Sequence, residues 1–551
     1  MSSYYSLKYN KNNATIEWLL EPTNHKNFRV IENETFFIFC EGNIFNYNLI
    51  DTSDQIKLTN ELKNNINYLE GDFSLFVYDK RDKSLIITND LTASKKIFFY
   101  NSLEYLQFSN SIYLCIPQNW TLNKSGLAQY LANGFTFSGN TLIEEISNLQ
   151  YATLLKVAHY SLSKDQYWKY TIKSVDKRPS VADYKKFDQL FTAAIKKRIK
   201  GQDIISLSGG FESTSIALKL SQSKPYLESF SYYGELSDMF DKKAVIQQNK
   251  HLKISNHFFK IKRKKSKSFF LLNSLLGMGV SNICRELEVI IELKKTYKEY
   301  NIFFGEETFG INKNKKNITD NLRLLNGEKL SKHYKKYINT KIIDQISSLL
   351  NNDILSHINN NKSEEKNKID ELYYEIQTTN KFTNWRYFFW EHFFSASNPL
   401  LDNSLIQFTS KLSPLQRDDK KFFVDYNHFV NKEFYSKTKR AGSKGYLEKI
   451  EGFIELIITK ISQKNNSFLT VPTKLRMILT ETKNLFNYVI SLLLSSINSR
   501  FSTKSYIPEI TKYNRVVLLN TTIELFNKTA EIKDVKSRST LIEKLISQNI
   551  N

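Results

Sequence analysis

The chain has 551 residues, of which 41% are hydrophobic, and its formal net charge is +22 at pH 7. This length suits two or three domains, and the excess lysine is spread along the chain, so we expect a solvated basic surface with affinity for ATP or an acidic substrate rather than a nucleic-acid partner. The three cysteines, Cys40, Cys115 and Cys284, have no metal-like spacing and cannot form a disulfide framework.

The first part of the chain favours β-strands. The predicted strands are residues 35–40, 71–79, 84–88, 96–100 and 106–108. A charged turn at 80–83 separates the second run from the third, which predicts an antiparallel hairpin. Because the apolar runs are nearly continuous, we expect layered sheets with buried faces.

Residues 204–218 combine a predicted buried strand, a glycine turn and a helix, and an amphipathic helix precedes them at 184–199. Strand, turn and helix in this order direct backbone N–H groups and the positive helix end towards an anion. The hydroxyls of Ser208, Ser213 and Thr214 add donors. The spacing differs from the Walker loop and the dinucleotide fingerprint, and a plain connecting turn is the alternative interpretation.

Alternating strands and helices follow this loop. The predicted elements are a strand at 227–233, a helix at 240–252, and strands at 257–261 and 301–304. This alternation predicts a parallel sheet, with a ligand beyond the carboxyl ends of its strands. Glu306 and Glu307 come directly after the last strand, and carboxylates beside a phosphate loop suit Mg²⁺. The alternative is a solvated turn.

The remaining segments carry less chemistry. Aromatic residues cluster at 385–394 and predict a helix core, with Glu391 and His392 as a satisfied pair or a base with a shifted pKa. Residues 171–180 form a polar linker, and 450–551 predict amphipathic helices. The N-terminus lacks the apolar core of a signal peptide, and the run at 489–494 is too short to span a bilayer. We therefore expect a cytoplasmic protein without a membrane partner.

Several motifs, in order, resemble the asparagine synthetase family. Gly-Asp-Phe-Ser-Leu-Phe-Val-Tyr-Asp at 71–79, Asn-Asp at 89–90, Lys-Lys-Ile-Phe-Phe-Tyr at 95–100 and Phe-Ser-Asn at 108–110 are similar to its glutaminase domain, as is the segment 122–168. Ser-Gly-Gly-Phe-Glu-Ser-Thr at 208–214 resembles the Ser-Gly-Gly-x-Asp-Ser-Ser pyrophosphate loop of ATP-pyrophosphatases. The segments 305–310, 398–402 and 437–446 resemble later motifs of the family.

The resemblance implies an α/β protein with three parts. These are a layered αββα, Ntn-hydrolase-like glutaminase domain at 1–170, a parallel-sheet ATP-pyrophosphatase domain at 181–449 and a helical extension at 450–551. It implies ATP contacts at Leu207, Ser208, Gly209, Gly210, Phe211, Glu212, Ser213, Thr214, Ser231 and Gly305. It further implies Mg²⁺ ligands at Glu212, Glu306 and Glu307, and a catalytic lysine at Lys444, with Lys439 as the alternative.

The glutaminase half departs from the family. The family's nucleophile is an N-terminal cysteine exposed after Met removal, and position 2 here is Ser2. The Arg-Gly-Pro-Asp motif has no counterpart between Asn13 and Phe36, and Asn-Gly-Glu appears as Glu-Gly-Asn at 41–43. We therefore expect an inactive glutaminase half.

The expected function is ATP-dependent amide-bond formation through adenylation of a small-molecule or peptide carboxylate. Members of the family without the cysteine include β-lactam and lasso-peptide macrolactam synthetases, which favours peptide macrolactam formation in natural-product biosynthesis. The alternatives are amidation of a sugar uronate in surface-polysaccharide synthesis and a catalytically degenerate binding partner. A peptide-delivery partner or a homodimer fits the first interpretation.

Overall fold

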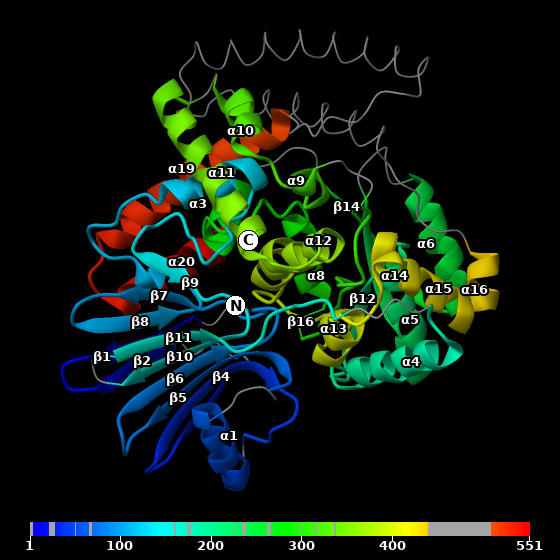
Figure 1. The fold of residues 1–551 in the computed structure, drawn as a ribbon, viewed down its shortest axis with the longest axis horizontal. Coiled ribbons are helices and arrows are strands. Elements are labelled where there is room, and N and C mark those ends of the chain that lie inside the picture. The colour runs from blue at the N-terminus through cyan, green and yellow to red at the C-terminus, as the bar shows by residue number, and fades with distance from the viewer. Residues whose placement is uncertain are drawn as a thin grey trace.

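The chain folds into a layered β-sandwich followed by a parallel sheet, and two C-terminal helices pack beside the sandwich (Figure 1). The computed structural model describes residues 4–20, 28–49, 51–64, 69–158, 161–173, 178–224, 226–233, 239–261, 266–297, 299–313, 317–335, 338–438 and 509–550.

Two antiparallel sheets form the sandwich. The first has the order β2-β1-β8-β7-β9 and the second β11-β10-β6-β5-β4-β3. The strands are β1 (Tyr5–Asn10), β2 (Thr15–Leu20), β3 (Phe28–Glu32), β4 (Phe36–Ile44), β5 (Gly71–Asp79), β6 (Ser84–Asn89), β7 (Phe98–Asn101), β8 (Tyr105–Ser109), β9 (Ile146–Asn148), β10 (Thr153–Ala158) and β11 (Ser161–Gln166). β5 and β6 pair antiparallel, which confirms the predicted hairpin.

The pattern of β4 explains how both faces of its sheet are buried. Phe37 and Phe39 lie in the core between the two sheets, whereas Ile38 and Cys40 lie in a second core beneath helix α1 (Thr52–Asn64). Alternate side chains of a strand point to opposite faces, so a continuous apolar run serves two cores.

Helices cover the outer face of the first sheet as well. Strand β7 contributes to a core with α2 (Ile112–Cys115), α3 (Lys124–Asn133), α7 (Lys267–Gly277), α19 (Glu509–Ala530) and α20 (Val535–Ile550). Arg515 of α19 donates to the carbonyls of Leu131 and Ala132 at 2.7 Å, and Arg538 of α20 donates to the carbonyl of Ile116 at 2.6 Å. The C-terminal helices thus complete the helical layer of the sandwich.

A third sheet follows the sandwich in the chain, and all its strands are parallel. Its strands are β12 (Asp203–Ser206), β13 (Glu228–Tyr233), β14 (Ser255–Lys260), β15 (Asn301–Phe303) and β16 (Ser395–Ser397), in the order β14-β13-β12-β15-β16. The prediction of a parallel sheet is confirmed, with β14 beginning and ending slightly earlier than the apolar run at 257–261 suggested.

Helices pack on both faces of this sheet. Ile205 of β12 shares a core with Phe187 of α4 and Ile216 of α5, whereas Ile204 lies in the other core with α7 and α8. The helices in this region are α4 (Val181–Lys196), α5 (Phe211–Ser223), α6 (Met239–Leu252), α8 (Leu287–Thr296), α13 (Asn403–Thr409), α14 (Pro414–Arg417), α15 (Lys421–Val430) and α16 (Lys432–Lys437).

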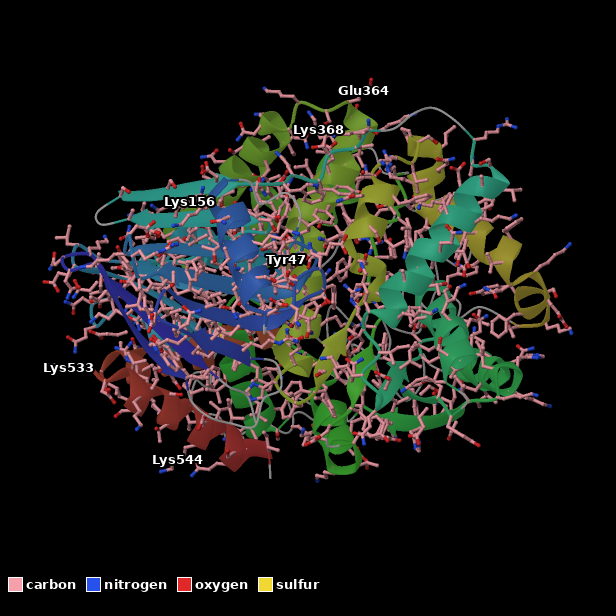
Figure 2. The ribbon with its side chains drawn as sticks, turned by 90° about the horizontal axis from the view of Figure 1, so that it is seen from below. Tyr47, Lys156, Glu364, Lys368, Lys533 and Lys544 are labelled. Carbon is pink, nitrogen blue, oxygen red and sulfur yellow. The ribbon has the colours of Figure 1, made fainter. Side chains whose placement is uncertain are left out.

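A helical insertion lies between β15 and β16. It comprises α9 (Ile318–Asn321), α10 (Gly327–Tyr334), α11 (Thr340–Asn360), α12 (Glu365–Tyr373) and the π-helices η1 (Tyr374–Phe382) and η2 (Asn384–Phe388), and short 3₁₀ turns follow at η3 (Pro399–Leu401) and η4 (Asp418–Lys420). None of the helices described is both long and apolar enough to cross a bilayer. Figure 2 labels lysines on separate sides of the molecule, such as Lys156 and Lys544, in keeping with a spread basic surface.

Candidate functional site

The carboxyl ends of β12 and β15 form the candidate site. The strand order reverses at β12, because β13 and β14 continue on one side while β15 and β16 lie on the other. In open parallel sheets, ligands bind in the crevice where the order reverses. The loop 207–210 follows β12 and the segment 304–307 follows β15, so the sheet brings two of the sequence-predicted motifs to this crevice.

The loop after β12 has the shape of an anion cradle. Gly209 adopts a φ of +77°, a conformation that favours glycine, and Gly210 is the N-cap of α5 with no side-chain cap. Ser208 donates its N–H to Ser213 Oγ at 3.2 Å, and the two hydroxyls lie 3.1 Å apart. The positive end of α5 and this pair of hydroxyls therefore meet at the exposed turn.

The neighbouring strands hold the loop in place. Leu207 donates its N–H to the carbonyl of Phe230 at 2.8 Å, and Ser231 Oγ donates to the carbonyl of Leu207 at 2.6 Å. Thr214 Oγ1 donates to Gln248 Oε1 at 3.0 Å. The predicted residues Ser231 and Thr214 thus brace the loop within the protein rather than facing the crevice with their hydroxyl protons.

Gly305 lets β15 approach the start of α5 closely. A Cβ atom at this position would lie 2.8 Å from Glu212 Cβ and 3.0 Å from the backbone nitrogen of Ser213. Any side chain here would push the two loops apart. The glycine therefore sets the spacing between the phosphate-type loop and the acidic segment.

The three predicted acidic ligands separate into two groups. Lys420 Nζ lies 2.5 Å from Glu212 Oε1 and 2.8 Å from Glu307 Oε1, so one ammonium group bridges these two carboxylates. Glu306 instead pairs with Arg386 at 2.7 Å, and Arg386 also contacts Glu286. Of the two glutamates after β15, it is Glu307, and not the Glu306 aligned with the family's Asp, that shares a cation with Glu212.

The backbone at Lys420, which pairs with these carboxylates, has an uncommon conformation. Asp419 and Lys420 have φ values of +47° and +61°, a left-handed conformation that non-glycine residues seldom adopt. Burial opposes the charge of Lys420, but Glu307 and Glu212 raise its pKa well above the ordinary value. Burial likewise raises the pKa of Glu307, and Lys420 opposes that rise. No sequence pattern pointed to this lysine.

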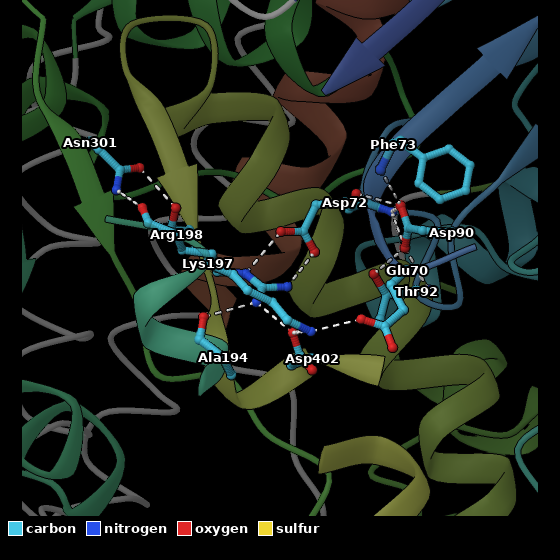
Figure 3. Close-up of polar contacts among 12 residues, drawn as sticks. Glu70, Asp72, Phe73, Asp90, Thr92, Ala194, Lys197, Arg198, Asn301 and Asp402 are labelled. Atoms are coloured by element: carbon cyan, nitrogen blue, oxygen red, sulfur yellow. Dashed lines mark hydrogen bonds and ion pairs between the residues drawn. The ribbon is translucent and has the colours of Figure 1, made fainter. Parts of the chain in front are cut away.

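A buried ion network joins the sandwich to the parallel-sheet part (Figure 3). The Arg198 guanidinium binds both oxygens of Asp72 at 3.0 Å and Asp402 Oδ2 at 2.7 Å, and it is only 3% exposed. Asn301 of β15 donates to the carbonyl of Arg198 at 2.9 Å. Asp72 and Asp402 lie in motifs found from the sequence, whereas Arg198 carried no recognisable signal.

A small cavity lies between the sandwich and the helices packed on it, beside this network. It has a volume of about 90 Å³ and is lined by Tyr4, Glu41, Lys95, Asn110 and Glu391, among others. Lys95 pairs with Glu391, so Glu391 has a charge partner in the sandwich. Ser2 lies outside the described residues, and Cys40, Cys115 and Cys284 are all buried.

The carboxyl group of Glu41, which lines this cavity, makes the stability of the folded protein depend on pH. Burial raises the pKa of Glu41 to about 7, with Lys95 opposing and Glu391 adding to the rise. The folded protein then holds a proton that the unfolded chain releases near its ordinary pKa, so stability falls as pH rises from about 4.5 towards 7. Glu41→Gln should raise the melting temperature relative to the parent at pH 8 and leave it nearly equal at pH 5. A uniform shift at both pH values would contradict this origin.

The comparisons with known proteins bear on the sandwich. Residues 26–168 match the family model of the glutamine amidotransferase domain. The chain contains a glutamine amidotransferase-like domain. The prediction of such a domain from the motifs at 71–110 is thereby confirmed. No curated protein matches the chain.

Two solved structures show a distant similarity to this chain. The structure of the allosteric regulatory enzyme of purine biosynthesis aligns at 7% identity and a TM-score of 0.19, covering 47% of this chain and 74% of the other. Glutamine phosphoribosylpyrophosphate amidotransferase from B. subtilis, complexed with ADP and GMP, aligns at 7% identity and a TM-score of 0.17, covering 47% and 75%. Similarity at this level carries no argument about activity.

The structure does not test the two predicted catalytic lysines. Lys444 and Lys439 fall outside the described residues, as does the run at 489–494. Among the residues that the structure describes, no group of three or more His, Cys, Asp or Glu side chains is arranged to hold a metal ion. The site therefore consists of the loop 207–214, Gly305, the acidic residues and Lys420.

Proposed function

We propose that this chain is an ATP-dependent, amide-bond-forming ligase of the asparagine synthetase kind, which adenylates a carboxylate and releases pyrophosphate. The observation that carries the proposal is the Ser-Gly-Gly loop at the reversal point of the parallel sheet, at the N-terminus of α5. The amidotransferase-like domain preceding it in the chain supports the same assignment.

The loop residues fit the phosphate groups of ATP. Bound ATP supplies the adenylyl group that activates the carboxylate. In this proposal the backbone of 208–211 and the hydroxyls of Ser208 and Ser213 bind the leaving pyrophosphate, because donors and the helix dipole converge there. Lys444, or alternatively Lys439, stabilises negative charge on the acyl-adenylate as an amine attacks it.

The acidic residues fit Mg²⁺ only in part. Glu212 and Glu307 offer the carboxylate oxygens that Mg²⁺ prefers, beside the loop that would present phosphate oxygens. Lys420 already neutralises this pair, so we propose that the lysine and Mg²⁺ compete for it. Glu306 does not fit the ligand set, because Arg386 holds its carboxylate.

We propose that the amidotransferase-like domain lacks glutaminase activity. The nucleophile position holds Ser2 and the described cysteines are buried, so the amine would come from free ammonia or from the substrate itself. A peptide that carries both carboxylate and amine, closed to a macrolactam, suits the basic surface. A peptide-delivery partner or a homodimer would accompany that role. Amidation of a sugar uronate is the second candidate.

ATP–pyrophosphate exchange over a panel of peptide and uronate carboxylates tests this proposal. We expect exchange with one class of carboxylate, at equal rates with and without glutamine, and no release of glutamate from glutamine. Absence of both exchange and ATP binding would favour a degenerate binding partner instead. Glutamate release that Ser2→Ala abolishes would show that the first domain is active.

A further inference from the structure

Away from the proposed nucleotide site, a serine contacts a histidine, and the same histidine contacts a glutamate. Ser138 Oγ is hydrogen-bonded to His357 Nε2, and His357 Nδ1 lies 3.0 Å from Glu375 Oε1. The three residues come from the turn after α3, from α11 and from the π-helix η1. Hydroxyl, imidazole and carboxylate in this order are the arrangement by which a serine is made nucleophilic.

The backbone presents Ser138 in a strained turn. Ser138 and Gly139 have φ values of +62° and +78°, and Asn140 donates its N–H to the carbonyl of Phe137 at 3.1 Å. This closes a turn with two left-handed central residues, in which serine is unusual. The buried Gln129 accepts the N–H of Phe137 at 2.9 Å and fixes the turn from below. Strain of this kind persists where the surrounding structure enforces it.

The partners of Ser138 are oriented as well. The ring of His357 packs edge-on against Phe137, with centroids 5.9 Å apart. Burial opposes the charge of Glu375, but the hydrogen bond to His357 keeps the pKa of this carboxyl below its ordinary value. An ionised Glu375 accepts the Nδ1 proton and leaves Nε2 free to accept the hydroxyl proton of Ser138.

A cavity adjoins the hydroxyl group. It has a volume of about 10 Å³, close to that of one water molecule, and is lined by Ser138, Gly139, Asn148, His357, Glu375 and Asn380, among others. Asn148 is 4% exposed, and its buried Oδ1 has no hydrogen-bond partner among the described residues. No described acceptor takes the N–H of Ser138 or Gly139. The cavity is therefore lined by a residue with a buried polar atom that has no described hydrogen-bond partner, as expected where a small polar molecule binds.

We propose that Ser138, His357 and Glu375 form a hydrolytic triad for carboxylic esters. Ser138 Oγ bonds to the ester carbonyl carbon as His357 Nε2 takes the hydroxyl proton, and the carbonyl electron pair moves to oxygen. Collapse of this intermediate expels the alcohol, which receives the proton from His357. Water then repeats the sequence on the acyl-serine, releasing the acid and restoring Ser138.

Covalent labelling of the full-length protein with a fluorophosphonate probe tests the triad. We expect one adduct on the peptide that contains Ser138, and hydrolysis of p-nitrophenyl acetate above the uncatalysed rate. His357→Gln should slow labelling at least about 100-fold, the contribution typical of a general base. Ser163→Ala, on an exposed position of β11, should label at the parent rate and serves as the matched control.

The result does not depend on how the variants fold, because the adduct is mapped on the unaltered protein. A folded protein that remains unlabelled at Ser138 would overturn the proposal. The contact between Ser138 and His357 would then have only a structural role. Labelling of Ser138 at equal rates in the parent and in folded His357→Gln would overturn it too. Neither readout requires ATP, so the ligase proposal can fail or succeed separately.

Discussion

Glu212→Ala is expected to weaken Mg-ATP binding at least about tenfold and to abolish ATP–pyrophosphate exchange. In the proposed site this carboxylate holds Mg²⁺ at the first turn of α5, beside the phosphate loop. Isothermal titration calorimetry with Mg-ATP measures the binding without knowledge of the carboxylate substrate. Asp425→Asn, which removes a partly exposed carboxylate paired with Lys421, is the control and should leave binding unchanged.

Lys420→Met should act in the opposite direction. Removing the ammonium takes away the counter-charge that Glu212 and Glu307 share, so Mg²⁺ no longer competes with Lys420 for these two carboxylates. We expect the Mg²⁺ concentration for half-maximal ATP binding to fall about tenfold, which corresponds to about 1.4 kcal/mol of electrostatic energy. A higher requirement for Mg²⁺ in this variant would contradict competition between the lysine and the metal. Unchanged binding in Glu212→Ala would remove that carboxylate from the site.

Arg198→Met is expected to destabilise the protein by about 3–5 kcal/mol. The guanidinium is the charge partner of Asp72 and Asp402 in a buried network, and its removal leaves Asp402 with only the more distant Lys197, at 3.8 Å, as a described charge partner. Chemical denaturation followed by fluorescence measures the loss. Arg81→Met breaks an ion pair with Asp79 in which the arginine is 63% exposed, and it should cost less than about 1 kcal/mol.

The same network allows a rescue experiment. Replacing Asp72 and Asp402 by asparagine in the Arg198→Met protein removes the unpaired charges, so stability should recover in part. Equal loss in Arg198→Met and Arg81→Met would show that the buried network contributes no more than a surface pair. The double substitution would then be without effect.

Local sequence patterns predicted the elements that local chemistry determines. The hairpin of β5 and β6 followed from apolar runs around a charged turn, and the loop at 208–210 followed from glycines between a strand and a helix. The acidic segment after β15 was also placed correctly beside that loop. The amidotransferase-like domain was recognised from ordered motifs, which the family match supports.

Long-range pairings could not be predicted in this way. Lys420 reaches Glu212 across 208 positions, and Ser138 meets His357 across 219, so no periodicity connects the partners. Lys420 also depends on a left-handed backbone that lysine does not favour, which no propensity would suggest. Arg198 could not be told from a surface arginine in the sequence, because its partner Asp72 belongs to the sandwich, 126 positions away.

The position of α19 and α20 has a consequence for synthesis of the chain on the ribosome. These last helices pack on α2 and α3, near the beginning of the chain, through Arg515, Arg538 and an apolar core. At about 5–20 residues per second, the apolar layer around α3 waits roughly 20 to 80 seconds for its covering helices. During that interval the nascent chain exposes a surface that chaperones recognise, and a messenger truncated before α19 would yield an aggregating product. The helical layer of the sandwich is thus complete only after α20 has been synthesised.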